Sequence, residues 1–277
     1  MAAAGAPIHH LNCGTMCPRG ARLLAGDGGW LAAATMVCHC LLIEAAEGLV
    51  LVDTGFGSGD VEDPRRLGQP FRALVRPELH QEETARSRIG QLGFAPEDVR
   101  HIVLTHLDLD HAGGLSDFAA AEVHLFAAEH AAAMQPTRSE RSRYIAEQWA
   151  HEPRWAVHDV AGDEWHGFES VRVLPGTEPA VLLIPLPGHT RGHTGVAVRR
   201  GDGWLLHCGD AYFHHREVET PSHSPAGLRL FQKLSEVDGK TRHANRERLR
   251  ELAAREGDGV ELICSHDPAD LERMGRR

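Results

Sequence analysis

Four potential metal ligands lie close together in the segment 106–111 (HLDLDH), directly after the apolar run 101–105 (HIVLT). The apolar run is typical of a buried strand, and the glycine pair at 113–114 predicts a turn beyond the polar residues. In extended chain, residues 106, 108 and 110 would project to one side while the two leucines pack into the protein. We interpret this segment as half of a metal site, whose candidate ligands are His106, Asp108, Asp110 and His111.

Three later strands are each expected to end at a further candidate ligand. The apolar runs 181–186, 204–208 and 260–264 are followed within a few residues by His189, Asp210 and His266. Ligand sites of α/β folds lie at the carboxyl ends of strands. These three residues therefore form the other half of the predicted site. A solvated polar strand end is the alternative explanation for segment 106–111, but alternating leucines fit it poorly.

Other histidines and cysteines give weaker signals. The chain has twenty histidines and six cysteines, and the cysteines form no paired C-x2-C module of a structural zinc site. Reduced, mostly buried thiols are the expected state. The segment 9–18, which holds Cys13 and Cys17, is interpreted as a turn, with a site-lining role as the alternative.

Composition limits the classes of function. The chain has 277 residues, 42% of them hydrophobic, and a net charge of -10, which disfavours binding to nucleic acid or to an anionic membrane. It has no long apolar span and no charged-then-apolar leader, so we expect a cytoplasmic protein that acts on a small molecule. One domain over residues 1–277 is expected, with irregular or helical insertions at about 60–77, 135–165 and 213–240. The sequence gives no prediction of the oligomeric state.

Alternating and helical patterns predict a mixed α/β architecture. Strands are expected at 37–43, 49–52 and 122–126, and helices at 82–92, 127–134 and 245–254. Helices would thus cover a mixed sheet, and the insertions would lie over the carboxyl ends of strands, where substrate pockets commonly form.

Five motifs occur in an order that closely resembles the metallo-β-lactamase superfamily: VLVDTG, THLDLDHAGG, PGHTRGHTG, GDAYF and SHD. The resemblance extends from about residue 37 to residue 266, and the spacing over 88–114 is most similar to the acyl-homoserine lactonase branch. It implies a four-layer αββα sandwich, in which two mixed β-sheets are flanked by helices.

The resemblance also implies a division of the ligands between two metal ions. One ion would take His106, Asp108 and His189, and the other Asp110, His111 and His266, with Asp210 bridging both. Asp53 and His193 resemble family positions that support the ligands.

Asp108 departs from the family pattern, because the family usually has HxHxDH where this chain has HxDxDH. A third carboxylate would remove one more positive charge and lower the Lewis acidity of the site. Zinc remains the favoured ion for the two positions, and the extra carboxylate makes manganese or iron the alternatives. A site with a single working ion is a further alternative.

The family pattern implies hydrolysis by a metal-bridged hydroxide, which Asp110 would orient. Tyr212 is a candidate donor to the carbonyl or the leaving group, with a packing role as the alternative. We therefore predict a metallo-hydrolase that cleaves a small ester, lactone or related acyl substrate. An iron-dependent oxidoreductase of the same fold, similar to the flavodiiron members, and a non-catalytic metal-binding protein are the other hypotheses.

Overall fold

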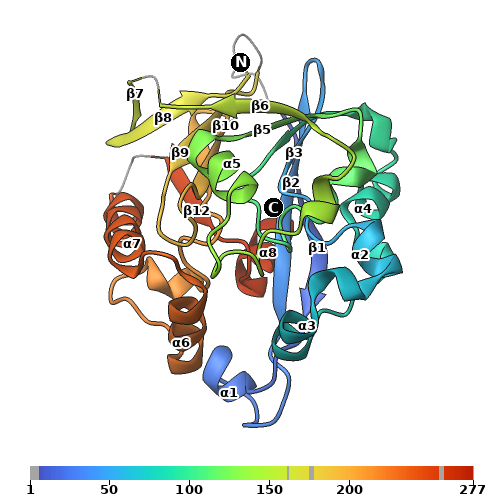
Figure 1. The fold of residues 1–277 in the computed structure, drawn as a ribbon. Coiled ribbons are helices and arrows are strands. Elements are labelled where there is room, and N and C mark those ends of the chain that lie inside the picture. Colours follow the sequence, from blue (N-terminus) through green and yellow to red (C-terminus); the bar gives the residue numbers. More distant parts are fainter. Residues whose placement is uncertain (1–5, 161, 175–177, 256–258, 277) are drawn as a thin grey trace.

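Two β-sheets packed face to face form the centre of the molecule, and helices cover their outer surfaces (Figure 1). This computed structural model describes residues 6–160, 162–174, 178–255 and 259–276. Within these residues each sheet has six strands. No helix in the described residues is both long and apolar enough to cross a membrane.

The first sheet takes its strands in chain order, β1 to β6. Pairing is antiparallel from β1 to β3 and parallel from β3 to β6, so the sheet is mixed. The strands are β1 (Ile8–Met16), β2 (Met36–Ala45), β3 (Gly48–Val52), β4 (Val99–Val103), β5 (Glu122–Phe126) and β6 (Arg154–His158).

The second sheet has the order β12-β11-β10-β9-β8-β7. Only β11 and β12 pair in parallel, and the other neighbours are antiparallel. The strands are β7 (Asp163–Trp165), β8 (Phe168–Arg172), β9 (Val181–Pro185), β10 (Thr194–Arg200), β11 (Gly203–His207) and β12 (Val260–Ile263).

Apolar side chains on both faces of each sheet fix this layering. Along β3, Val50 and Val52 face the second sheet, where they pack with Val196 and Val198 of β10. The intervening Leu51 faces the outer helices. Sheets buried on both faces need such continuous apolar runs.

Helices form the two outer layers. Apolar residues of α3, α4 and α5 pack on the outer face of the first sheet, and those of α7 pack on the second. The α-helices are α1 (Ala21–Leu24), α2 (Ser58–Glu62), α3 (Gln69–Val75), α4 (Ala85–Gln91), α5 (Ala127–Met134), α6 (Ala226–Ser235), α7 (Gly239–Ala254) and α8 (Pro268–Gly275). Short 3-10 helices span Pro64–Leu67, Gln81–Glu83, Pro96–Asp98, Leu115–Phe118, Ala146–Trp149 and His215–Glu217. The predicted αββα sandwich is confirmed.

Two segments differ from their predicted structure. The residues expected to form a turn at 9–18 lie mostly in the edge strand β1, where Cys13 is fully buried. The segment 135–165, expected to be irregular or helical, contains β6 and β7. β6 and β7 each lie at the edge of a sheet. Side chains there are partly exposed, and the apolar alternation that identifies a strand is weak.

Candidate metal centre

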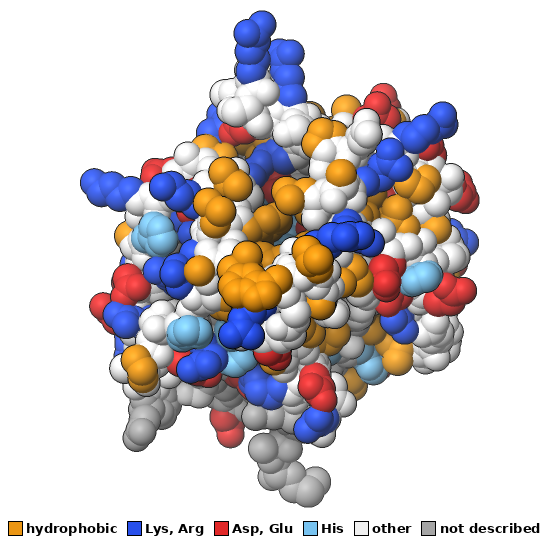
Figure 2. Space-filling view, turned by 90° about the horizontal axis from the view of Figure 1, so that it is seen from below, with side chains coloured by type: hydrophobic (Ala, Val, Ile, Leu, Met, Phe, Trp, Pro, Cys, Tyr) orange, Lys and Arg blue, Asp and Glu red, His pale blue; other side chains and the backbone are white. Residues whose placement is uncertain are grey.

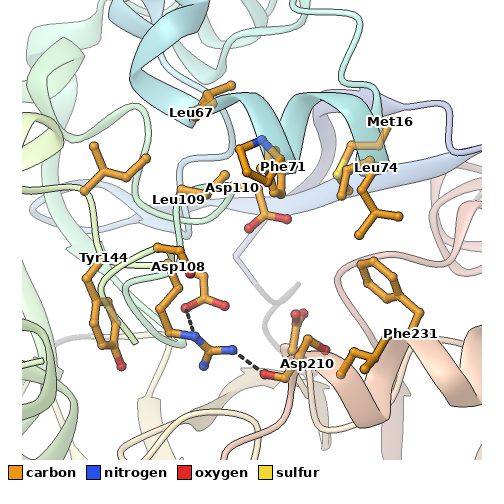
Figure 3. A pocket seen from close by; sticks show the side chains of 18 of the residues that line it. Met16, Leu67, Phe71, Leu74, Asp108, Leu109, Asp110, Tyr144, Asp210 and Phe231 are labelled. Atoms are coloured by element: carbon orange, nitrogen blue, oxygen red, sulfur yellow. Dashed lines mark hydrogen bonds and ion pairs between the residues drawn. The ribbon is translucent and has the colours of Figure 1, made fainter. Parts of the chain in front are cut away.

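Seven acidic and histidine side chains converge where strands of both sheets end. The segment 106–111 follows β4 of the first sheet, and the other three residues follow β9, β11 and β12 of the second. Figure 3 shows the three aspartates of this group pointing into one cavity. The converging residues are those predicted from the sequence: His106, Asp108, Asp110, His111, His189, Asp210 and His266.

One set of donor atoms surrounds Asp108. Its Oδ2 lies 3.0 Å from His189 Nε2 and 3.6 Å from His106 Nε2. Asp210 Oδ2 closes the set, at 3.3 Å from His189 Nε2 and 3.9 Å from His106 Nε2.

A second set lies on the other side of Asp210. Asp210 Oδ1 is 3.1 Å from His266 Nε2 and 3.5 Å from His111 Nε2. Asp110 completes this set, at 3.7 Å from His266 Nε2 and 3.9 Å from His111 Nε2. Asp210 therefore belongs to both sets, and its Oδ2 also lies 3.2 Å from His266 Nε2.

The donor atoms fit divalent metal ions. Ligands placed tetrahedrally about 2.1 Å from zinc lie roughly 3.4 Å from one another, close to the separations in both sets. His106 Nε2, His111 Nε2 and Asp210 Oδ1 are buried without a hydrogen-bond partner among the described residues. A buried polar atom without a partner costs folding free energy. These three unpaired atoms therefore support a cation at the centre.

Hydrogen bonds to the opposite ring nitrogens orient three of the imidazoles. His111 Nδ1 donates to Asp53 Oδ2 at 2.9 Å, and His266 Nδ1 donates to the Val37 carbonyl at 2.9 Å. Thr105 Oγ1 donates to Asp53 at 2.7 Å and accepts from His106 Nδ1 at 2.9 Å. Each Nε2 is thus the ring nitrogen directed at the centre, where it can ligate an ion that displaces its proton.

His193 supports Asp210 instead of joining the ligand sets. Its Nδ1 donates to the Leu186 carbonyl at 3.0 Å, and its Nε2 accepts from the Asp210 backbone N–H at 2.8 Å. Both ring nitrogens are therefore used, and the loop that carries Asp210 is anchored to the end of β9.

The electrostatic field of the site favours cations. Burial opposes ionisation of Asp108 and Asp210, yet Arg143 beside Asp108, and His266 and His111 beside Asp210, hold the pKa of each carboxyl well below its usual range. Burial also opposes a charged His111, but Asp210, Asp110 and Asp53 outweigh it and raise its pKa to about 10. Concentrated negative charge of this kind is what a dication neutralises.

Arg143 is the principal site residue that the sequence analysis missed. Its Nε lies 3.5 Å from Asp108 Oδ1, while its guanidinium also donates to the backbone carbonyls of His189 and Ser235. Arg143 also lines the cavity that opens over the site. It lies in a loop with two other nearby arginines at 138 and 141, so no sequence signal marked it.

Glu129 is a second residue that the sequence did not reveal. It is fully buried at the start of α5 and accepts from Leu107 N at 2.9 Å, Thr190 Oγ1 at 2.6 Å and Tyr144 Oη at 3.1 Å. The backbone N–H of Gly192 donates to it as well, at 3.2 Å. Glu129 thereby joins the loop after β4 to the loop after β9.

Tyr212, predicted as a candidate donor, does not reach the site. Its side chain is fully buried in the apolar cluster between the second sheet and α7, with Ile184 and Leu249. The neighbouring Phe213 lines the cavity, but Tyr212 does not. Neighbouring side chains in an extended chain point to opposite sides. The spacing from Asp210 could not show which of residues 212 and 213 faces the cavity.

A cavity of about 570 Å³ opens over the two donor sets. Its floor holds Asp108, Asp110, His189, Asp210 and His266. Its walls are largely apolar and come from β1, α3, α6 and their neighbouring loops, with Met16, Met36, Leu67, Phe71, Leu74, Val75, Phe213, Phe231 and Leu234 among the lining residues. Figure 2 shows hydrophobic side chains gathered on the face where α1, α3 and α6 lie.

Comparison with known proteins identifies the family. Residues 34–256 match the family model of the metallo-beta-lactamase superfamily. The chain belongs to the metallo-β-lactamase superfamily. A curated "Probable metallo-hydrolase" of Mycobacterium tuberculosis is 44% identical over 270 residues, which cover 97% of this chain and 82% of that protein.

Lactonases of this superfamily are also similar. An N-acyl homoserine lactonase of Bacillus cereus is 28% identical over 72% of this chain and 75% of that protein. A solved structure of a Bacillus thuringiensis AiiA mutant with N-decanoyl-L-homoserine in its active site matches with a TM-score of 0.73 and 19% identity, covering 98% of this chain and 96% of that one. The predicted family, fold and enzyme class of metallo-hydrolase are confirmed.

Proposed function

We propose that this metallo-hydrolase cleaves the acyl bond of a small lactone or ester that carries an apolar acyl chain. The observation that carries the proposal is the pair of donor sets that share Asp210 and open into an apolar cavity. Similarity to an N-acyl homoserine lactonase supports the lactone or ester class.

The proposed ligand assignment follows the two donor sets. His106, Asp108 and His189 would hold one ion, Asp110, His111 and His266 would hold the other, and Asp210 would contribute to both. Bound divalent ions lower the pKa of water toward neutrality and polarise a substrate carbonyl. Zinc is the favoured ion because imidazole nitrogen and carboxylate oxygen are its common ligands.

Asp110 is the proposed residue for orienting the attacking water. Its carboxylate belongs to the second donor set and also lines the cavity, so one side chain faces both the centre and the substrate. A carboxylate there accepts a hydrogen bond from water and directs the oxygen lone pair toward the carbonyl.

Arg143 compensates for the additional carboxylate at position 108. Two divalent ions bring four positive charges, three carboxylates remove three, and the guanidinium beside Asp108 returns one. The net charge is then two, the same as that left by two carboxylates alone, which is the number in the usual family pattern. The Lewis acidity expected to fall because of Asp108 is thus maintained, and Arg143 also lies where it can stabilise developing negative charge on the substrate oxygen.

The cavity walls suit the acyl chain. Phe71 and Leu74 of α3 face Phe231 of α6 across the opening (Figure 3), and Leu234 of α6 also lines the cavity. Burial of apolar area is worth roughly 25 cal/mol per Å², so a chain of several methylenes gains binding energy there that a short acetyl group cannot.

Hydrolysis assays test this proposal. Protein of known metal content, reconstituted with zinc, manganese or iron, is assayed on acyl lactones and esters with short and long chains, a thioester, a phosphotriester and a β-lactam. The proposal predicts metal-dependent turnover of lactone or ester, with KM falling as the acyl chain lengthens. Turnover confined to the phosphotriester or β-lactam would contradict the proposed substrate class, and metal-dependent oxygen consumption without hydrolysis would favour the oxidoreductase hypothesis.

A further inference from the structure

A second group of histidines lies on the first sheet, apart from the centre described above. His101 of β4 is in register with Glu122 of β5, and Val103 is in register with His124. The two histidines and the glutamate therefore share the face of the sheet on which Val103 packs. All three side chains come from adjacent parallel strands, which fixes their relative positions more firmly than loops would.

The donor atoms of these residues form a nearly equilateral triangle. His101 Nδ1 lies 3.0 Å from His124 Nε2, and Glu122 Oε2 lies 3.6 Å from His101 Nδ1 and 3.5 Å from His124 Nε2. Three ligands of one tetrahedral zinc ion stand about 3.4 Å apart. The triangle thus has the dimensions of three corners of a zinc coordination sphere without any rearrangement.

His158 of β6 orients the central imidazole. Its Nε2 lies 3.0 Å from His124 Nδ1, the ring nitrogen that faces away from the triangle. Metal-binding histidines are usually held in this way by a partner on the opposite nitrogen. The three strands β4, β5 and β6 therefore all contribute to the arrangement.

Burial and charge also suit a metal ion. His124 is buried, whereas the side chains of His101 and Glu122 are 22% and 44% exposed, so solvent can supply a fourth ligand. Burial lowers the pKa of His101 and lowers that of His124 to about 3. Both imidazoles are consequently neutral at physiological pH, the form that binds metal.

We propose that His101, Glu122 and His124 form a separate binding site for a zinc-like transition metal ion on the first sheet. Two imidazole nitrogens and one carboxylate oxygen select such an ion over calcium or magnesium, which prefer all-oxygen sites. Because the ligands join β4 to β5, the bound ion acts as a clamp between strands. The site is independent of the proposed hydrolytic activity.

Zinc titration against a chromophoric chelator tests the site. The probe is Zn²⁺ alone, added to wild-type protein, Glu122→Gln and His101→Asn after metal removal. Wild type is expected to bind one equivalent more than either variant at saturation, while hydrolytic activity stays the same in all three. His158→Asn is expected to keep the site but weaken it by roughly 10- to 100-fold.

His80→Asn is the matched control. His80 is exposed on a loop, its Nε2 lies 3.7 Å from Glu78 Oε2, and it belongs neither to the triangle nor to the two donor sets of the centre. Its zinc stoichiometry should equal that of wild type. Equal stoichiometry and affinity in wild type, Glu122→Gln and His101→Asn would overturn the proposal, because the imidazoles would then be a hydrogen-bonded ladder without a metal. Glu122 is partly exposed, so Glu122→Gln decides the outcome even if His101→Asn fails to fold.

Discussion

Arg143 Nε lies 3.5 Å from Asp108 Oδ1, and this ion pair joins the residue that departs from the usual family motif to a cation from a separate loop. The guanidinium also donates to the His189 carbonyl, so the arginine braces the loop of another proposed ligand. The departure at position 108 is therefore accompanied by a compensating charge in the structure.

Arg143→Gln is expected to lower kcat/KM by about 10- to 100-fold, equivalent to about 1.4 to 2.7 kcal/mol of transition-state stabilisation. The physical reason is the loss of one positive charge beside the centre. Arg143→Lys keeps that charge and should retain most of the activity. Steady-state kinetics on the best substrate, at saturating metal, measure both variants.

Asp108→His in the Arg143→Gln background supplies the matched test of charge compensation. The double variant restores the usual motif together with its usual charge, so it should recover activity relative to Arg143→Gln alone and bind zinc in preference to manganese. Strictly additive losses from the two substitutions would contradict compensation. Unchanged metal content and preference in Asp108→His would show that Asp108 is not a ligand.

Asp53→Asn is expected to weaken metal binding by roughly 10- to 100-fold, because Asp53 orients His111 directly and His106 through Thr105. Competition with a chelator of known affinity measures the change. Asp63→Asn, at an exposed aspartate paired with Arg65, is the control and should bind metal as wild type does. Equal affinities in the two variants would refute the role of Asp53.

Tyr212→Phe should change kcat by no more than about twofold, since the side chain is fully buried and does not line the cavity. The polar neighbour of its buried hydroxyl is the Cys208 thiol, a weak hydrogen-bonding group, so removal of the hydroxyl should also cost little stability. A fall in kcat of a hundredfold, with unchanged metal content and folding, would restore Tyr212 as the proton donor.

Glu129→Gln should lower the free energy of unfolding by about 1 to 3 kcal/mol, because an amide has one acceptor oxygen where the carboxylate uses two for four donors. Denaturant unfolding measures the loss. Glu251→Gln, at an exposed position of α7, is the control and should be within about 0.5 kcal/mol of wild type. A similarly small effect of Glu129→Gln would show that these loops hold together without it.

The candidate ligands could be predicted because their signals are local. His106, His189 and His266 each follow an apolar strand, and strand ends of packed sheets meet at one edge of the molecule. The leucines that alternate with the aspartates are buried, as the pattern required. The order of the five motifs along the chain indicated the superfamily, and the superfamily implied the rest of the fold.

Residues whose roles depend on contacts between distant segments could not be predicted. Arg143 meets Asp108 across 35 positions, and Glu129 meets Thr190 across 61. Nothing in a single sequence distinguishes such an arginine or glutamate from a surface residue. The prediction that Tyr212 donates to the substrate is not supported by the structure for a related reason, because spacing does not determine which way a loop side chain points.

The most direct test of the central claim measures metal content and lactone or ester hydrolysis on the same samples of wild type and Asp110→Ala. Chelator-stripped wild type should lose its activity and regain it as about two equivalents of zinc return to the catalytic centre, counted in a Glu122→Gln background to exclude the proposed second site. Asp110→Ala should remain inactive at every zinc concentration, because the second ion loses a ligand and the water loses its orienting carboxylate. Full activity in metal-stripped protein, or in Asp110→Ala, would contradict the account.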